Sequence, residues 1–336
     1  MRSAFGAEFD LADTYVNTPS IGIPPAHVAD AVAEAVERWR TGANGPADFD
    51  EAVRQSREGF ARLAGVPAET VAIGATASSL IGMVAAGLPD GARVLTATRE
   101  FTSVSFPFAA QAHRGITVTE APLADVPRLA GEYDLVAVSV VQSADGAWAD
   151  LDALRSAGVP VLLDATQAAG WTPLRLDWAD WVVAAGYKWL LSPRGAAWLA
   201  VHPRALERTV PVAANWYGAE DPWEAVYGLP LRLAKTARRL DQSPVWLSQM
   251  GAAAALPYLG ALDLDAVRAH CVGLANALRG GLGLPRADSA IVSFDADVAR
   301  LAAAGIRASA RAGKARVGFF LYNTLSDVDR ILHAVE

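Results

Sequence analysis

The chain has 336 residues, of which 52% are hydrophobic and 19% charged, a balance typical of a folded globular protein rather than a disordered one. The length is about twice that of a typical domain, so we expect one large domain and a smaller one. The net charge of -7 without a basic cluster argues against a nucleic-acid partner, and no apolar run approaches the ~20 residues of a membrane span.

The N-terminal part of the chain predicts two helices and no secretion signal. Residues Met1–Asp13 mix charged and small residues and lack the apolar core of a signal peptide. Apolar residues recur at helical spacing in Ala26–Arg40, directly after two prolines, and a second helix is expected over Phe49–Leu63.

Seven short apolar runs follow, with helical or loop segments between several of them. Most runs are apolar throughout instead of alternating, as expected for strands that are covered on both faces. This pattern predicts βα units and a mostly parallel seven-stranded sheet in a large α/β domain. The runs are Val71–Gly74, Arg93–Thr98, Ile116–Ala121, Leu135–Val141, Pro160–Ala165, Trp181–Gly186 and Ala196–Val201.

The C-terminal part predicts a smaller α+β domain. We expect helices over Ala252–Leu259 and Leu264–Leu278, and a closing helix over Ser326–Val335 that Ser326 caps. The division that follows is an N-terminal segment, 1–45, that joins the small domain, a large domain over 46–240 and a small domain over 241–336. The expected strands of the small domain are Ala290–Phe294, Ile306–Ala310 and Ala315–Leu321.

Cysteine and lysine are both scarce. Cys271 is the single cysteine, which excludes an intramolecular disulfide and a cysteine-rich metal site, and a cytoplasmic location is the default expectation. Only Lys188, Lys235 and Lys314 are lysines among 29 basic residues. A lysine kept in an apolar setting then indicates chemistry that arginine cannot perform, because only a lysine amine can lose its proton and attack a carbonyl.

Two predicted strands end in a carboxylate and an amine. The run Pro160–Ala165 contains Asp164 near its end, and Trp181–Gly186 is followed by Tyr187 and Lys188. Ligands of open α/β sheets bind at the carboxyl ends of the strands. The two groups could form only a salt bridge, or they could hold a pyridoxal ring, which needs a lysine for a Schiff base and an acid at its ring nitrogen.

Two further segments could complete such a site. Residues Ile73–Ser79 combine a strand end, a glycine, hydroxyls and a helix N-terminus, which together suit an anion such as a phosphate. Phe101 follows another strand and offers an aromatic face to a ring. Plainer interpretations stay open, with Thr76 as a helix cap and Phe101 as a core residue.

Several motifs together resemble the class V aminotransferase family of pyridoxal-phosphate (PLP) enzymes. The first is Leu163-Asp-Ala-Thr-Gln167, followed by Ala185-Gly-Tyr-Lys-Trp-Leu190 and Ser192-Pro-Arg-Gly195. The resemblance implies fold type I of the PLP-dependent transferases, PLP as cofactor and an amino acid as substrate. Similar motifs elsewhere in the chain are Tyr15–Pro25, Glu100–Ser103 and Arg316–Thr324.

The resemblance implies a role for each matched residue at the cofactor. Lys188 would form the Schiff base, and Asp164 would pair with the pyridinium nitrogen. Gln167 would donate a hydrogen bond to the phenolic oxygen of the ring. Thr76, with the backbone amide of Ala75, would bind the phosphate.

Further roles concern the ring face, the substrate and a partner subunit. Phe101 would stack on the ring, and Tyr187 would bind the phosphate, as in kynureninase-like sequences. Arg316 would clamp the substrate carboxylate, with Asn17 also at the substrate. Ser243 lies in a segment that usually reaches the phosphate of a partner subunit, so a homodimer is implied. Lys314, close to Arg316 in sequence, could help to attract an acidic substrate.

The resemblance to the epimerase-like branch of the family, which includes the ergothioneine-pathway C–S lyase, implies β-elimination on an S-substituted cysteine as the leading reaction. Cysteine desulfurases carry a nucleophilic cysteine just before the C-terminal motif, but Ser309–Ala315 has none, and Cys271 lies in an expected helix. An aminotransferase and a decarboxylating deaminase are the enzymatic alternatives. A non-catalytic PLP-binding module and an α/β protein without PLP stay open as well.

Overall fold

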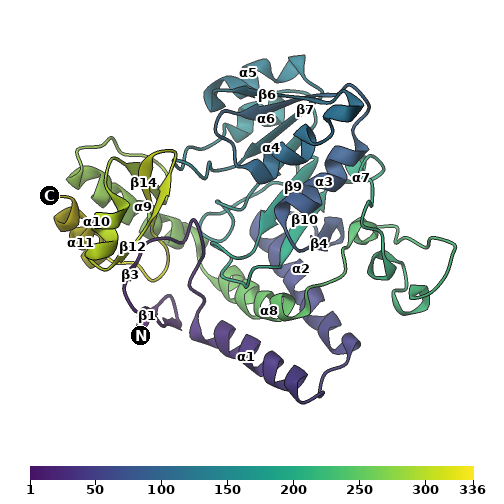
Figure 1. Cartoon of the computed structure of the whole chain (residues 1–336), viewed down its shortest axis with the longest axis horizontal. Helices are drawn as coiled ribbons and strands as arrows, with labels where there is room; N and C mark the ends of the chain where they lie inside the picture. The colour runs from purple at the N-terminus through teal and green to yellow at the C-terminus, as the bar shows by residue number, and fades with distance from the viewer.

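The computed structural model describes all 336 residues and is built around one seven-stranded sheet (Figure 1). The strand order is β4-β10-β9-β8-β7-β5-β6; β10 runs antiparallel to both of its neighbours, and the other adjacent pairs are parallel. The prediction of a mostly parallel seven-stranded sheet is confirmed. The strands are β4 (Val71–Gly74), β5 (Arg93–Ala97), β6 (Thr117–Ala121), β7 (Leu135–Ser139), β8 (Val161–Asp164), β9 (Trp181–Ala185) and β10 (Ala197–Val201).

Helices cover both faces of the sheet, which explains why most of its strands are largely apolar, whereas the edge strand β6 is polar and mostly exposed. Leu162 of β8 belongs to a hydrophobic cluster with Leu80 and Phe108, whereas its neighbour Leu163 belongs to a second cluster with Phe60 and Leu256. Helices α3 and α4 therefore cover one face, and α2 and α8 the other. The helices around the sheet are α2 (Asp50–Ala64), α3 (Ala77–Gly87), α4 (Thr102–Ala109), α5 (Val126–Leu129), α6 (Leu151–Ser156), α7 (Pro203–Leu206) and α8 (Trp246–Ala261).

The C-terminal part forms a second, smaller layer beside the large sheet (Figure 1). Its antiparallel sheet has the order β11-β14-β13, and its helices enclose a separate hydrophobic cluster that includes Leu278, Val317 and Ile331. The elements are α9 (Leu264–Gly281), β11 (Ile291–Phe294), α10 (Val298–Ala303), β13 (Ser309–Arg311), β14 (Lys314–Gly318) and α11 (Leu325–Val335).

The N-terminal segment contacts both parts of the molecule. Strands β1 (Arg2–Ala4) and β2 (Ala7–Phe9) form a hairpin, and β3 (Thr14–Tyr15) pairs in parallel with β12 (Ile306–Arg307) of the C-terminal part. Helix α1 (Ala26–Arg40) packs along α8. The division of the chain at residues 45 and 240 stays a prediction.

Two predicted elements of the C-terminal part differ from the structure. The single strand expected over Ile306–Ala310 is two strands, because the chain changes partners there: β12 pairs with β3, and β13 pairs with β14. The cap expected at Ser326 is wrong. Helix α11 begins after Thr324, whose backbone N–H donates to the carboxylate of Asp327 at 2.9 Å, a bond that satisfies the helix entrance.

The remaining predicted boundaries shift by a few residues. Helix α8 is longer than the expected Ala252–Leu259 at both ends and continues through Pro257. None of the helices combines the length and hydrophobicity that a membrane span needs. Short 3₁₀ helices are η1 (Pro46–Phe49), η2 (Ala68–Thr70), η3 (Ala112–Arg114), η4 (Leu123–Asp125), η5 (Ala130–Glu132), η6 (Trp216–Gly218), η7 (Trp223–Ala225) and η8 (Ala237–Leu240).

Candidate active site

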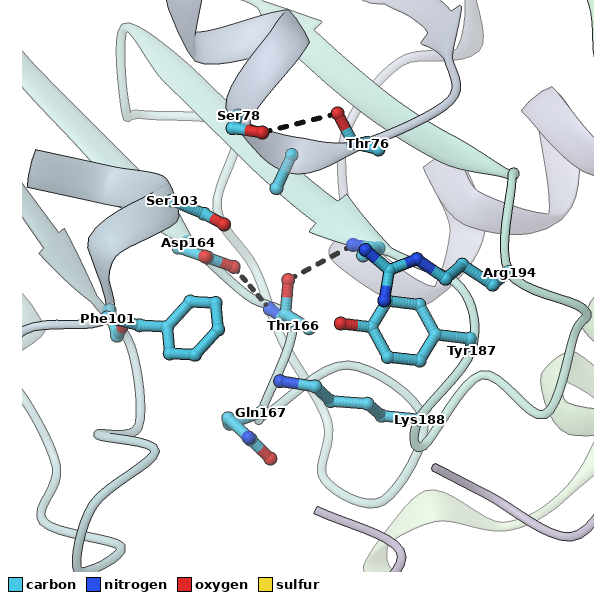
Figure 2. Close-up of a pocket in the computed structure, with 13 residues that line it drawn as sticks. Thr76, Ser78, Phe101, Ser103, Asp164, Thr166, Gln167, Tyr187, Lys188 and Arg194 are labelled. Atoms are coloured by element: carbon cyan, nitrogen blue, oxygen red, sulfur yellow. Dashed lines mark hydrogen bonds between the residues drawn. The ribbon is translucent and has the colours of Figure 1, made fainter. Parts of the chain in front are cut away.

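A cavity of about 540 Å³, counting its open mouth, lies at the carboxyl ends of β8 and β9 (Figure 2). It is lined by residues that follow several strands of the large sheet. Six of the predicted site residues line it: Thr76, Phe101, Asp164, Gln167, Tyr187 and Lys188. The other lining residues are Ala77, Ser78, Ser103, Ser139, Thr166, Ala185 and Arg194.

Asp164 is the last residue of β8 and is almost fully buried, with 4% of its surface exposed. One carboxylate oxygen accepts a hydrogen bond from the backbone N–H of Thr166 at 2.8 Å, and the carboxylate forms no salt bridge. Burial raises the pKa of Asp164, although Thr166 and the charge of Lys188 act in the opposite direction. A buried acid without an ion-pair partner suits a cationic group in the cavity.

Lys188 follows β9 after a two-residue turn and is also buried, with 5% exposed. Its Nζ lies 5.0 Å from the ring centre of Phe101 and 5.7 Å from that of Tyr187. Burial lowers the pKa of Lys188 to about 8, against the opposing effect of Asp164. A larger neutral fraction makes this amine a nucleophile near neutral pH, as a Schiff-base lysine requires.

The N-terminal segment supports the Lys188 turn from outside. The backbone N–H of Gly22 donates to the carbonyl of Tyr187 at 2.9 Å. A Cβ atom on Gly22 would collide with the carbonyl oxygen of Lys188, so glycine is required for this close approach.

One end of the cavity suits a phosphate. Thr76 caps α3, its hydroxyl oxygen accepts from the backbone N–H of Ser79 at 3.1 Å, and the hydroxyl of Ser78 lies 3.3 Å from that oxygen. The guanidinium carbon of Arg194 lies 5.2 Å from the ring centre of Tyr187. Figure 2 shows the Arg194 guanidinium beside the Tyr187 hydroxyl. A helix N-terminus, hydroxyls and a guanidinium are the donors that phosphates bind.

Gln167 lines the cavity with its hydrogen-bonding groups already occupied. Its Nε2 donates to the carbonyl of Pro19 and to the hydroxyl of Ser143, both at 3.0 Å, and its Oε1 accepts from the indole N–H of Trp189 at 2.7 Å. Donation to a cofactor ring therefore requires that one of these bonds be exchanged. The role of Gln167 at the ring stays a prediction.

Arg316 lies deeper, on β14, and does not line the cavity. It is 1% exposed, and it donates to the hydroxyls of Ser143 at 2.8 Å, Ser20 at 2.8 Å and Ser309 at 3.3 Å. It has no carboxylate partner. Burial, followed by the charge of Arg311, lowers the pKa of Arg316 to about 9. A buried guanidinium held by neutral hydroxyls suits an incoming carboxylate.

Three other predicted site residues lie outside the cavity. The backbone N–H of Ala75 donates to the side chain of Gln242 at 3.4 Å, and Ser243 is exposed. Asn17 forms a backbone bridge with Gly318, and its buried side-chain oxygen has no hydrogen-bond donor. An unpaired buried acceptor is uncommon and suits a ligand N–H group.

The sequence prediction missed Arg194 and Glu100, although both stand in motifs that were recognised. The Glu100 carboxylate is buried and accepts from the backbone N–H of Ser139 at 2.8 Å, the Ser139 hydroxyl at 2.6 Å and the backbone N–H of Phe101 at 2.8 Å. Burial raises the pKa of Glu100. The carboxylate thus fixes the backbone that presents Phe101 to the cavity. Nothing in the sequence distinguished three further lining residues, Ser78, Ser103 and Thr166, from their neighbours.

The residues present fit PLP: a buried amine, a buried acid without a cation, and a set of phosphate donors share one cavity. The family model described as Aminotransferase class-V matches residues 25–287. The chain belongs to the class-V aminotransferase family. The predictions of this family, of PLP as cofactor and of a PLP-dependent enzyme are confirmed.

Curated relatives agree with this family. The protein described as uncharacterized aminotransferase YcbU of Bacillus subtilis (strain 168) is 29% identical over 66% of this chain. The alignment spans 64% of that relative, slightly less than two thirds of its length. Isopenicillin N epimerase of Streptomyces clavuligerus is 27% identical over 48% of this chain and 46% of its own length, consistent with the epimerase-like branch.

Solved structures share the fold of this class-V chain. The complex of the cystine C–S lyase C-DES with cysteine persulfide superimposes with a TM-score of 0.86, at 20% identity, over 96% of this chain and 97% of the other. The predicted fold type I is confirmed.

Proposed function

We propose that the protein is a PLP-dependent C–S lyase that acts on an S-substituted cysteine by β-elimination. The observation that carries the proposal is the buried Lys188, with its pKa lowered to about 8, in one cavity with the unpaired carboxylate of Asp164. This pair suits amino-acid chemistry that begins with loss of a proton from Cα.

Each residue of the site has a task in this proposal. When bound, PLP supplies an electron sink for negative charge at the substrate Cα. Lys188 would hold the cofactor covalently, and its Nζ would accept the proton from the substrate Cα. Asp164 would support a protonated ring nitrogen, and Arg316 would orient the substrate through its carboxylate. Thr76, Ser78, Tyr187 and Arg194 hold the phosphate.

The single cysteine supports elimination over desulfurase chemistry. Cys271 is buried in α9, and burial raises the pKa of its thiol. A nucleophilic cysteine must be accessible and largely ionised, and this thiol is neither. We therefore expect Cys271→Ala to leave turnover within about twofold of the wild type while costing roughly 1 kcal/mol of stability, measured as initial rates and thermal unfolding.

The solved structure of similar fold that is named a cystine C–S lyase supports the same choice. The test is to incubate the PLP-loaded protein with an S-substituted cysteine and to measure pyruvate and ammonia, with and without an added keto acid. We expect both products without a keto acid. Product formation that depends on a keto acid would instead identify an aminotransferase, and release of carbon dioxide a decarboxylating deaminase. A chain that binds PLP but converts no amino acid would be a binding module.

We also propose a homodimer, because an exposed and largely apolar segment projects from the molecule before α8. The segment between α7 and α8, green in Figure 1, extends away from the body of the protein. It carries Tyr227 at 88% exposure and Leu229 at 90%, with Trp223 and Leu231 also exposed. Light scattering should show a dimer, and Tyr227→Ser with Leu229→Ser should weaken it. A monomer at all concentrations would contradict this proposal.

A further inference from the structure

Positive charge exceeds negative charge around Lys188, although the chain as a whole is acidic. The guanidiniums of Arg194, Arg311 and Arg316 are all close enough to act on Lys188, and Asp164 is the only acid that opposes them there. None of the three arginines forms a salt bridge within the chain, whereas other arginines, such as Arg2, Arg57 and Arg204, pair with an aspartate. A group of cations without acid partners around the cavity amine suits anionic ligands.

Two of these guanidiniums converge on one neutral hydroxyl. Nη2 of Arg316 lies 2.8 Å from the Ser20 oxygen, and Nη2 of Arg311 lies 3.3 Å from the same atom. No carboxylate separates them. Like charges held this close repel each other, and an anion that binds between or beside them relieves the repulsion.

Two anions are already assigned in the proposed function. The cofactor phosphate occupies the end of the cavity that Arg194 shares with Tyr187 and α3, and the α-carboxylate of the substrate occupies Arg316. Arg311 has no anion assigned. It lies in the hairpin of β13 and β14, opposite Lys314 in the strand register, and its side chain is exposed.

Lys314 is a poorer candidate for the same task, although its sequence position suggested it. Its Nζ lies 3.2 Å from a carboxylate oxygen of Asp295, so an acid of the chain already pairs with it. Arg311 therefore provides the cation without an acid partner beside Arg316.

We propose that Arg311 recognises a second anionic group on the substrate, so that the preferred substrate is an amino acid whose side chain ends in an acid. The cleavage of a carbon–sulfur bond in that side chain rests on the proposed function, but the recognition of the acid does not. Arg316 takes the α-carboxylate, Arg311 takes the acid at the far end of the side chain, and Ser20 holds the two guanidiniums in a fixed relation.

Binding is tested with a pair of ligands that cannot undergo elimination. L-2-Aminopimelate has a carbon in place of the sulfur of S-(2-carboxyethyl)-L-cysteine, and its side-chain amide differs only in the terminal charge. Calorimetry with the PLP-loaded protein should show that the acid binds about tenfold more tightly than the amide, as one charge-assisted hydrogen bond predicts. Arg311→Gln should remove most of this preference and leave the affinity for the amide within about twofold.

Two variants serve as controls. Arg307→Gln removes an exposed arginine of the neighbouring strand β12, which pairs with Asp13 at 3.0 Å, and it should retain the full preference for the acid. Arg311→Lys should retain part of the preference, because it keeps the charge without the planar donor pair. Equal binding of acid and amide by the wild type, binding of neither, or an equal loss of both in Arg311→Gln would overturn the inference.

Turnover separates this inference from the proposed function. S-(2-carboxyethyl)-L-cysteine and S-(2-carbamoylethyl)-L-cysteine should both release pyruvate, the first with the higher kcat/KM. Pyruvate from both at equal kcat/KM would support the lyase and contradict a role for Arg311. Pyruvate from neither, with the difference in aminopimelate binding intact, would contradict the lyase and support recognition of a second acid.

Discussion

Two parts of the candidate site are built in different ways. The strand-end wall, formed by Asp164, Tyr187 and Lys188, stands directly on β8 and β9. The guanidinium wall, as we name Arg311 and Arg316 with Ser20, lies outside the cavity lining and joins a C-terminal hairpin to a segment near the start of the chain. Rigid strands position groups for chemistry, whereas residues from separate segments can adapt to a substrate. We therefore expect the first wall to control kcat and the second to control substrate binding.

The largest effect is expected for Lys188→Ala. Without the amine, the protein loses both the covalent link to PLP and the acceptor of the Cα proton, so turnover should fall by about 10⁴-fold or more. Mass spectrometry after borohydride treatment should find the cofactor attached to wild-type protein but not to the variant. Lys235→Ala, at an exposed lysine, should behave as wild type. A cofactor still attached to Lys188→Ala would refute the assignment.

A smaller effect is expected for Asp164→Asn. The amide keeps the shape of the side chain but cannot hold a proton at the ring nitrogen, so kcat should fall by roughly 10²- to 10³-fold while PLP still binds. Asp180→Asn is the matched control, because Asp180 is equally buried but interacts with Arg204 and Arg208 near the start of β9. That variant should lose stability and retain kcat. Similar losses of kcat in both variants would contradict a special role for Asp164.

On the other wall, Arg316→Ala should act on binding. Loss of the guanidinium should raise KM by about 10- to 100-fold and change kcat much less, because the α-carboxylate carries the same charge in the ground state and the transition state. Arg279→Ala removes another buried arginine, which donates to the carbonyls of Ser289 and Ile291, and should affect stability alone. If KM does not change in Arg316→Ala, another residue binds the carboxylate.

The smallest expected effect concerns the pH dependence of PLP attachment to the apoprotein. Because burial holds the pKa of Lys188 at about 8, below its ordinary value of 10.5, the neutral amine increases as the pH rises through about 8. The rate of PLP attachment to the apoprotein should rise with pH and level off above about 8. Asp164→Asn removes a charge that raises this pKa, so its midpoint should lie at lower pH. A midpoint near the ordinary value would show that Lys188 is solvated.

The same pKa has a consequence for the stability of the apoprotein. Between about pH 8 and 10.5 the unfolded chain binds a proton at Lys188 that the folded chain does not. The free energy of unfolding should therefore increase with pH across this window, as urea titrations can measure, and Lys188→Met should abolish the increase. An increase that persists in Lys188→Met would assign it to another group.

Local pattern alone determined the large sheet and the strand-end wall. Strands covered on both faces are largely apolar, so most of the seven were recognisable, and the ends of neighbouring parallel strands bring Asp164 and Lys188 to one edge. The same pattern singled out Phe101 and the segment that contains Thr76, and the family motifs added a phosphate role for Tyr187; the cavity brings all three together with this pair.

Only the tertiary structure shows which residues form the guanidinium wall and that β10 runs antiparallel to its neighbours. Ser20 and Arg316 are separated by 296 positions, and no periodicity in the sequence encodes a contact between segments so far apart. Contacts between distant segments also determine the hydrogen bonds of Gln167 with Pro19 and Ser143. The same holds for the salt bridge of Lys314 with Asp295. The sequence therefore shows which chemical groups are present. Only the folded structure shows which of the cations lack an acid partner.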